Sequence, residues 1–190
     1  MNFPYIYPKN PQFIYKTSDG SSGIRYVLGK PGKNNIICFG INPSTATPEK
    51  LDKTILNVEK IAKNNGFDGW IMLNIYPKRE TDSNLLGQIC KDLTIHKNNL
   101  KVISAIFECI KKPSVWCAWG NCIMNAGELY DYLDDIYKIL QNRNISWYEL
   151  DGLRTKYGHP RHPCRVSNKS KLAEFKNFDQ YMENILHSHH

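Results

Sequence analysis

Short apolar runs alternate with longer stretches of helical periodicity along most of this chain. Four of the runs have the length of a strand and are rich in β-branched and aromatic residues. They occupy residues 35–41 (NIICFGI), 70–76 (WIMLNIY), 114–119 (SVWCAW) and 145–150 (ISWYEL). Proline or glycine follows each of the first three within two residues, as expected where a buried strand ends. The pattern predicts four buried strands.

The stretches between these runs carry apolar residues three and four positions apart, which is the spacing of a buried helix face. Three helices are predicted to bury Leu51, Ile55, Val58, Ile61 and Ala62; Leu100, Ile103, Ile106, Phe107 and Ile110; and Ala126, Leu129, Tyr130, Leu133, Ile136, Tyr137 and Leu140. A further helix is predicted at about 170–186, and a short strand at 24–28.

Strands that alternate with helices are typical of βαβ units. We therefore predict an α/β fold, a three-layer sandwich around a central, mainly parallel, four-stranded sheet. The length of 190 residues suits one domain, which we place at 1–190. Residues 1–23 are rich in Pro, Gly, Ser and Tyr and are predicted to form a peripheral N-terminal arm.

The carboxyl ends of parallel strands share one edge of the sheet, and open α/β sheets bind ligands there. Four segments follow the predicted strand ends, namely 42–45 (NPST), Asn74, 119–121 (WGN) and 158–167 (GHPRHPCRVS). We expect the candidate site among them. Structural alternatives remain open, since Asn42 can close a strand in an Asx-Pro turn and Asn74 can bond backbone groups alone.

The charge of the chain narrows the choice of partner. Lys and Arg number 25 against 18 acids, which gives +7 and a pI near 9.0. Such a balance favours an anionic partner, although a basic protein without one is also common. Residues 152–173 contain no acid and six basic residues, which are Arg154, Lys156, Arg161, Arg165, Lys169 and Lys171. We predict that this segment faces phosphates; a solvated charged loop is the alternative.

Other sequence features exclude several classes of function. Six cysteines without a C-x-x-C pair lie mostly in apolar runs, so reduced thiols are expected, without a disulfide framework or a metal site. No 18-residue apolar run or signal peptide is found, so we expect a cytoplasmic protein without a membrane partner. The ending HSHH at 187–190 resembles the remnant of a purification tag. Dinucleotide, P-loop and hydrolase motifs are absent, and no cofactor is expected.

Four short motifs together resemble those of the uracil-DNA glycosylase superfamily. They read GINPS at 40–44, IMLN at 71–74, CAWG at 117–120 and HPCRVS at 162–167, in the order and placement found in that superfamily. The pattern INPSTAT, followed by D-x-T and GHPRHP, is more similar still to a bacterial and phage family known as DUF1643, over about residues 24–167. The resemblance implies a uracil-DNA glycosylase-like fold.

The same resemblance implies a role for individual residues. Asn42 would handle the attacking water and the sugar cation, and His162 would bond the base carbonyl as negative charge develops. Asn74 would read a flipped base, and Ser44 stands where the most active branch has a tyrosine that excludes larger bases. Val166 takes the place of the apolar wedge that enters the duplex. Asn42 also replaces the catalytic acid of that branch.

Two functions follow from this resemblance. The first is a DNA glycosylase that flips a damaged or modified base, in single- or double-stranded DNA, into a pocket lined by Asn42, Asn74 and His162. The second is a catalytically inactive relative that binds nucleic acid or an acidic protein that mimics DNA. Asp52, of the D-x-T motif, is either a pocket carboxylate or, more commonly, an acid at the start of a helix.

Overall fold

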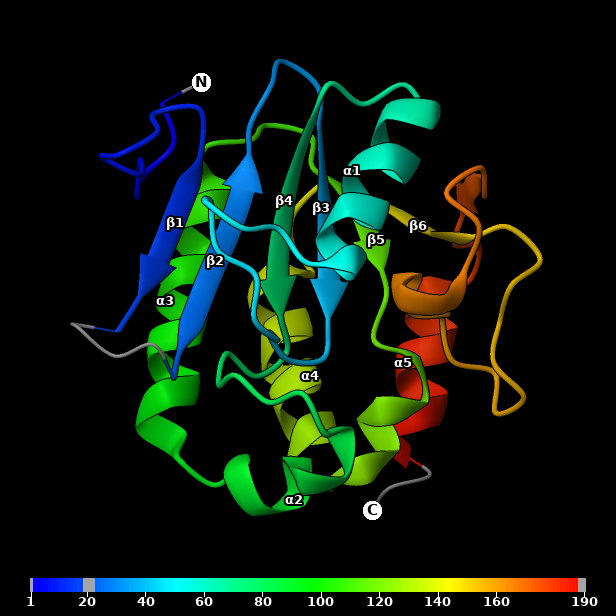
Figure 1. Ribbon diagram of the computed structural model, residues 1–190. Coiled ribbons are helices and arrows are strands. Elements are labelled where there is room, and N and C mark those ends of the chain that lie inside the picture. Colours follow the sequence, from blue (N-terminus) through cyan, green and yellow to red (C-terminus); the bar gives the residue numbers. More distant parts are fainter. Residues whose placement is uncertain (1, 19–22, 188–190) are drawn as a thin grey trace.

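The computed structural model describes residues 2–18 and 23–187, which form one seven-stranded sheet flanked by helices (Figure 1). The strands are β1 Ile14–Thr17, β2 Arg25–Lys30, β3 Asn35–Gly40, β4 Gly69–Asn74, β5 Ser114–Cys117, β6 Ser146–Leu150 and β7 Leu172–Glu174. The α-helices are α1 Lys53–Asn64, α2 Leu86–Ile89, α3 Leu93–Glu108, α4 Glu128–Leu140 and α5 Phe178–His187. Short 3₁₀ turns occur at Ser83–Leu85, Gly120–Asn125 and Pro163–Arg165.

The strand order is β1-β2-β4-β3-β5-β6-β7. The four central strands β4, β3, β5 and β6 are parallel to their neighbours within this group. β2 and β1 continue the sheet antiparallel on one side, and β7 adds one antiparallel strand on the other. The carboxyl ends of the parallel strands therefore lie together at one edge.

The predicted α/β class and the four predicted strands are confirmed, but the described sheet has seven strands instead of four. Two of the additional strands, β1 and β7, are hard to detect because they are short, partly exposed strands at the edges of the sheet. The short strand predicted at 24–28 is β2, which joins the same sheet. The helix predicted from residue 170 begins only at Phe178, because residues 172–174 pair with β6 as β7.

Side chains that alternate along the strands build one core on each face of the sheet. Ile36 and Cys38 of β3 pack in the core that includes α1, whereas Ile37 and Phe39 pack in the core that includes α3, α4 and α5. In Figure 1, α1 covers one face of the sheet, and α3 and α4 lie behind the other. The arrangement is three layers, with the sheet in the middle.

None of the helices in residues 2–18 and 23–187 is long and apolar enough to cross a membrane. Residues 188–190, most of the predicted tag remnant, lie outside the described residues, and His187 is the last residue of α5.

Candidate functional site

Asn74, the last residue of β4, has a buried side-chain amide without a hydrogen-bond partner. The residue is fully buried, and neither Oδ1 nor Nδ2 is hydrogen-bonded within the part of the chain described. Gly40 lies opposite it in the register of β3 and β4. A Cβ on Gly40 would lie 3.1 Å from Asn74 Oδ1 and 4.0 Å from His162 Nε2, so the glycine gives these two side chains their space. An unpaired buried amide costs free energy, and Asn74 is the one residue for which two buried side-chain polar atoms lack a partner among the described residues.

Asn99 of α3 bonds the backbone of Asn74 but not its side chain. The buried Asn99 Nδ2 donates to the carbonyl oxygens of Asn74, at 2.9 Å, and Ile75, at 3.1 Å. α3 packs on the face of the sheet away from α1. Trp70 and Met72, which share the strand alternation of Asn74, pack on the α1 side. The amide of Asn74 therefore belongs to the α1 face of the sheet.

The side chain of His162 is a neutral imidazole that carries its proton on Nε2. Burial lowers the pKa of His162 to about 4, although the Asp52 carboxylate acts in the opposite direction. Nδ1 accepts a hydrogen bond from the backbone N–H of Cys164 at 3.2 Å, so the tautomer with the proton on Nε2 is required. Nε2 is the atom nearest to the Gly40 and Asn74 side of the ring. The neutral N–H donor of His162 and the unpaired amide of Asn74 thus lie on the same side of Gly40, although Asn74 is fully buried and does not line the cavity that contains His162.

The lowered pKa of His162 predicts a pH-dependent stability. Between about pH 6.5 and about pH 4 the unfolded chain binds a proton that the folded chain does not, so stability falls as the pH falls. The expected loss is about 2–3 kcal/mol after allowance for partial exposure. Urea unfolding of the native chain and of His162→Gln at neutral pH and near pH 4 measures it. His96 and His159 titrate in both proteins, so identical pH dependences would contradict the prediction.

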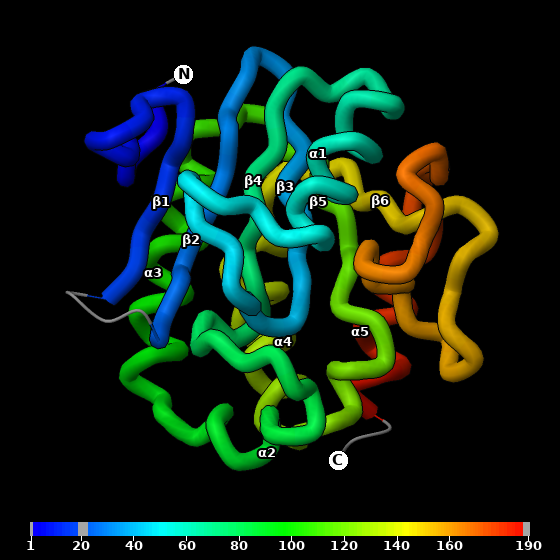
Figure 2. The backbone as a smooth tube through the Cα atoms, viewed as in Figure 1, coloured from blue at the N-terminus to red at the C-terminus, as the bar shows by residue number. Residues whose placement is uncertain are grey.

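The segment that carries His162 is anchored to the end of β5. The backbone N–H of Gly120 donates to the carbonyl of Pro160 at 2.9 Å. Gly120 has a positive φ of 63°, and a Cβ there would lie 3.2 Å from His162 Cβ. Figure 2 shows this segment, in yellow and orange, returning past the end of β5. The glycine permits both the turn and the close approach.

A hydrogen-bonded relay fixes the same segment to α5. Trp119 Nε1 donates to the hydroxyl of Tyr181 at 2.9 Å, and that hydroxyl lies 3.0 Å from His159 Nδ1. Because the hydroxyl accepts from Trp119, its own proton is free to bond His159, whose pKa is lowered by burial. All three residues are buried. The relay joins the end of β5, and residues 152–173, here called the basic segment, to α5.

Three asparagines of α1 and its C-cap hold the following stretch of chain. Asn57 Nδ2 donates to the carbonyls of Pro163, at 2.7 Å, and Val166, at 3.1 Å. Asn64 bonds the carbonyl of Asn168, and Asn65 bonds the backbone of Ser170 and Leu172. These contacts were missed at the sequence level because the asparagines look like the polar face and the stop signal of a helix.

The basic residues predicted to face phosphates have different surroundings. Lys156, Arg161 and Arg165 line a cavity of about 420 Å³ together with His162 and Asn121, whose buried Oδ1 lacks a partner among the described residues. Arg154 instead forms a bidentate ion pair with Glu149, with both N–O distances at 2.7 Å, and Lys169 is exposed. Arg154 is thus paired with a carboxylate, and three of the other five basic residues of the segment lie at the cavity, whereas Lys169 and Lys171 are exposed outside it.

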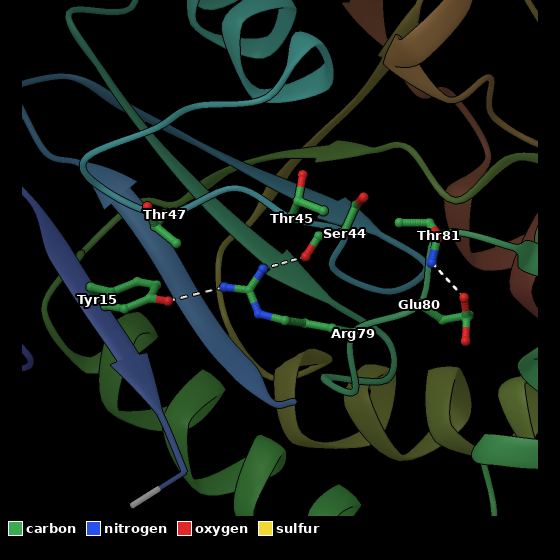
Figure 3. Close-up of a pocket in the computed structure, with 7 residues that line it drawn as sticks. All are labelled: Tyr15, Ser44, Thr45, Thr47, Arg79, Glu80 and Thr81. Carbon is green, nitrogen blue, oxygen red and sulfur yellow. Dashed lines mark hydrogen bonds between the residues drawn. The ribbon is translucent and has the colours of Figure 1, made fainter. Parts of the chain in front are cut away.

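The other predicted site residues lie in neighbouring loops. Asn42 Nδ2 donates to the carbonyls of Glu80, at 2.8 Å, and Pro43, at 3.2 Å, and so ties two loops together. Ser44 lines a second cavity of about 370 Å³, drawn in Figure 3. Val166 is half-buried and packs against the α1-side core. Asp52 accepts from the backbone N–H of Ile55 at 2.9 Å as the N-cap of α1, so its interpretation as a helix-start acid is confirmed.

These features define an α/β protein with a candidate ligand site at the carboxyl edge of its central parallel strands. A family model described as "Protein of unknown function (DUF1643)" matches residues 25–164. The match covers more than half of the chain and includes Gly40, Asn74 and His162, so the chain belongs to the DUF1643 family. No curated protein and no solved structure matches the chain.

Proposed function

We propose that this protein binds DNA and holds one nucleobase at the carboxyl edge of the sheet, in a fold related to the uracil-DNA glycosylases. The observation that carries the proposal is the fully buried Asn74 amide, which has neither of its groups paired in the described residues. An amide offers one donor and one acceptor, which complements the N–H and C=O groups on the edge of a base. A base taken out of the helical stack supplies those groups.

The cavity beside His162 supports binding of DNA in particular. Its volume of about 420 Å³ lies within the usual range for ligand sites, and Lys156, Arg161 and Arg165 line it. Cations at the mouth of such a cavity neutralise backbone phosphates. An acidic protein that mimics DNA would satisfy the cations but would leave Asn74 unpaired, so DNA is the better match. The six thiols are all free, which agrees with a place in the cytoplasm, the compartment we propose.

Hydrolysis of the N-glycosidic bond is a second candidate function, and His162 favours it. A neutral Nε2–H donor stabilises negative charge on a departing base. Asn42 has no carboxylate, and its amide nitrogen is engaged by two carbonyls, so only its oxygen remains to orient a water molecule. General-base activation of water by this residue is therefore weak. For this reason base binding, and not cleavage, is the function that we place first.

Binding to oligonucleotides of defined sequence tests the proposal. Fluorescence anisotropy should show tighter binding to single- or double-stranded DNA that carries uracil, hydroxymethyluracil, hypoxanthine or an alkylated base than to unmodified DNA. Alkaline treatment of the same mixtures detects abasic sites, so strand breaks would establish the second function. Equal affinity for all modified and unmodified strands would contradict recognition of a base.

The salt dependence of DNA binding tests whether the cavity lined by Lys156, Arg161 and Arg165, here called the basic cavity, contacts DNA. Replacing both Arg161 and Arg165 with alanine should weaken binding and lower the slope of log K against log salt by about 2, since each arginine neutralises about one phosphate. Arg143 lies after α4, at the opposite edge of the sheet, so Arg143→Ala is the matched control and should leave the slope unchanged. An unchanged slope in the double variant would remove the cavity from the DNA interface.

A further inference from the structure

Arg25, in β2, is a buried cation without a carboxylate partner among the described residues. Its side chain is among the largest fully buried ones, and the residue is 2% exposed. Nη1 donates to the carbonyl of Ala46 at 3.3 Å, and Nε lacks a partner among the described residues. Burial and the neighbouring Arg79 lower the pKa of Arg25 to about 10, so the group is still charged at neutral pH. A buried charge that lacks a counterion is destabilising, and structures rarely retain one without a reason.

Arg79 brings a second positive charge to the same carbonyl. Arg79 Nη2 donates to Ala46 O at 3.0 Å. It also donates to the hydroxyl of Tyr15 at 3.0 Å, and Nη1 donates to Ser44 O (Figure 3). These bonds use three of the five N–H groups of a guanidinium. Within residues 2–18 and 23–187, no ion pair joins Arg25 or Arg79 to a carboxylate. Two cations therefore share one backbone oxygen, and Asp52 is the acid that acts on Arg25 from farther away.

Residues that carry hydroxyl groups line the cavity in front of Arg79. It has a volume of about 370 Å³, and Ser44, Thr45, Thr47 and Thr81 contribute to its wall. Glu80 also lines it, but its carboxylate accepts the backbone N–H groups of Thr81 and Asp82. In Figure 3 that carboxylate is turned towards Thr81, away from the guanidinium of Arg79. The Glu80 carboxylate therefore bonds backbone N–H groups and does not face the guanidinium of Arg79.

We propose that this cavity binds a phosphate group, which Arg79 and the hydroxyls of Ser44 and Thr45 contact while Arg25 supplies a second positive charge from the interior. Guanidinium and hydroxyl groups are suitable donors to the oxygens of a phosphate. The phosphate belongs either to a free nucleotide or to the backbone of a nucleic acid. Because no base is needed, the inference goes beyond the proposed function and stands separately from it.

Titration of the full chain with inorganic phosphate, followed by ³¹P NMR and calorimetry, tests the site. We expect saturable binding that weakens at least about tenfold in Arg79→Gln, since one hydrogen bond to a charged group contributes about that factor. Arg143→Gln is the matched control and should bind phosphate like the native chain. Absence of saturable binding to the native chain, or equal affinity in Arg79→Gln, would overturn the proposal. Neither result bears on base binding, because phosphate contains no base.

Arg79 also holds residues 44–46, so its replacement affects more than the ligand. Ser44→Ala and Thr45→Val remove only hydroxyl groups, and each should weaken phosphate binding without lowering the melting temperature. A nucleoside 5′-monophosphate and a short phosphodiester oligonucleotide, each competing with phosphate, identify the source of the group. A nucleoside that lacks phosphate should not compete. Competition by the nucleoside equal to that of its monophosphate would contradict a phosphate site.

Discussion

Asn74→Leu is expected to stabilise the protein and abolish its recognition of a modified base. Leucine branches at Cγ as asparagine does, although it is larger, and it has no polar atoms, so it removes two buried groups that lack partners in the described residues. Relief of that penalty should raise the free energy of unfolding by about 1–2 kcal/mol. DNA binding through the basic cavity should remain, at the affinity for unmodified strands. Urea unfolding and anisotropy titrations measure the two effects.

Asn99→Leu is the matched control for this change. The substitution is chemically identical, and both asparagines are fully buried. Asn99 Oδ1 also lacks a partner among the described residues, but Asn99 Nδ2 donates two hydrogen bonds to backbone carbonyls at the end of β4, and its replacement removes both. We expect Asn99→Leu to lower the free energy of unfolding by about 2–3 kcal/mol. Destabilisation by Asn74→Leu of similar size would show that its amide is structural and would contradict a ligand role.

Tyr181→Phe is expected to cause the largest loss of stability among the substitutions considered. It removes the hydroxyl that accepts from Trp119 and bonds His159, so two buried nitrogens lose their partners. At about 1–2 kcal/mol for each, the free energy of unfolding should fall by about 2–4 kcal/mol. The basic segment should also become more mobile, because the relay anchors it to α5. Thermal unfolding and amide hydrogen exchange at residues 154–162 measure these effects.

Tyr137→Phe provides the control for loss of a tyrosine hydroxyl. Tyr137 also bonds a residue of α5, since its hydroxyl lies 2.8 Å from Asp179 Oδ1, but that bond is exposed to solvent. Its removal should cost less than about 1 kcal/mol. Equal losses in the two variants would mean that the relay contributes no more than an ordinary surface contact.

The central fold was predictable because β3 and β4 are buried on both faces. Every residue of these two strands is buried, so each appears in the sequence as a nearly continuous apolar run. β7 gave no such signal, since its three residues are half-buried or exposed and only its pairing with β6 makes it a strand. The local sequence pattern therefore identified the buried central strands. It did not identify the edge strand β7, which forms only by pairing with β6.

The candidate site was only partly predictable for a similar reason. Asn74 and His162 follow or face the ends of parallel strands, so topology alone placed them at one edge. The unpaired state of the Asn74 amide could not be predicted, and backbone partners were the commoner expectation. The ion pair of Arg154 depends on the facing position of Glu149 in β6. Arg25 was missed, although a single arginine at the start of an apolar strand was a signal that something unusual was buried there.

The contacts between α1 and the basic segment have a consequence for how this family can diversify. Asn57, Asn64 and Asn65 all bond main-chain atoms of residues 163–172, and Gly120 bonds the main chain of Pro160. The path of residues 163–172 is thus held mainly through main-chain atoms, and most side chains of these residues do not determine it. Residues such as Cys164, Arg165 and Lys169 are free to change identity while the chain keeps its course. Substitutions in this one short stretch are therefore expected to change what the protein binds, with little cost to folding.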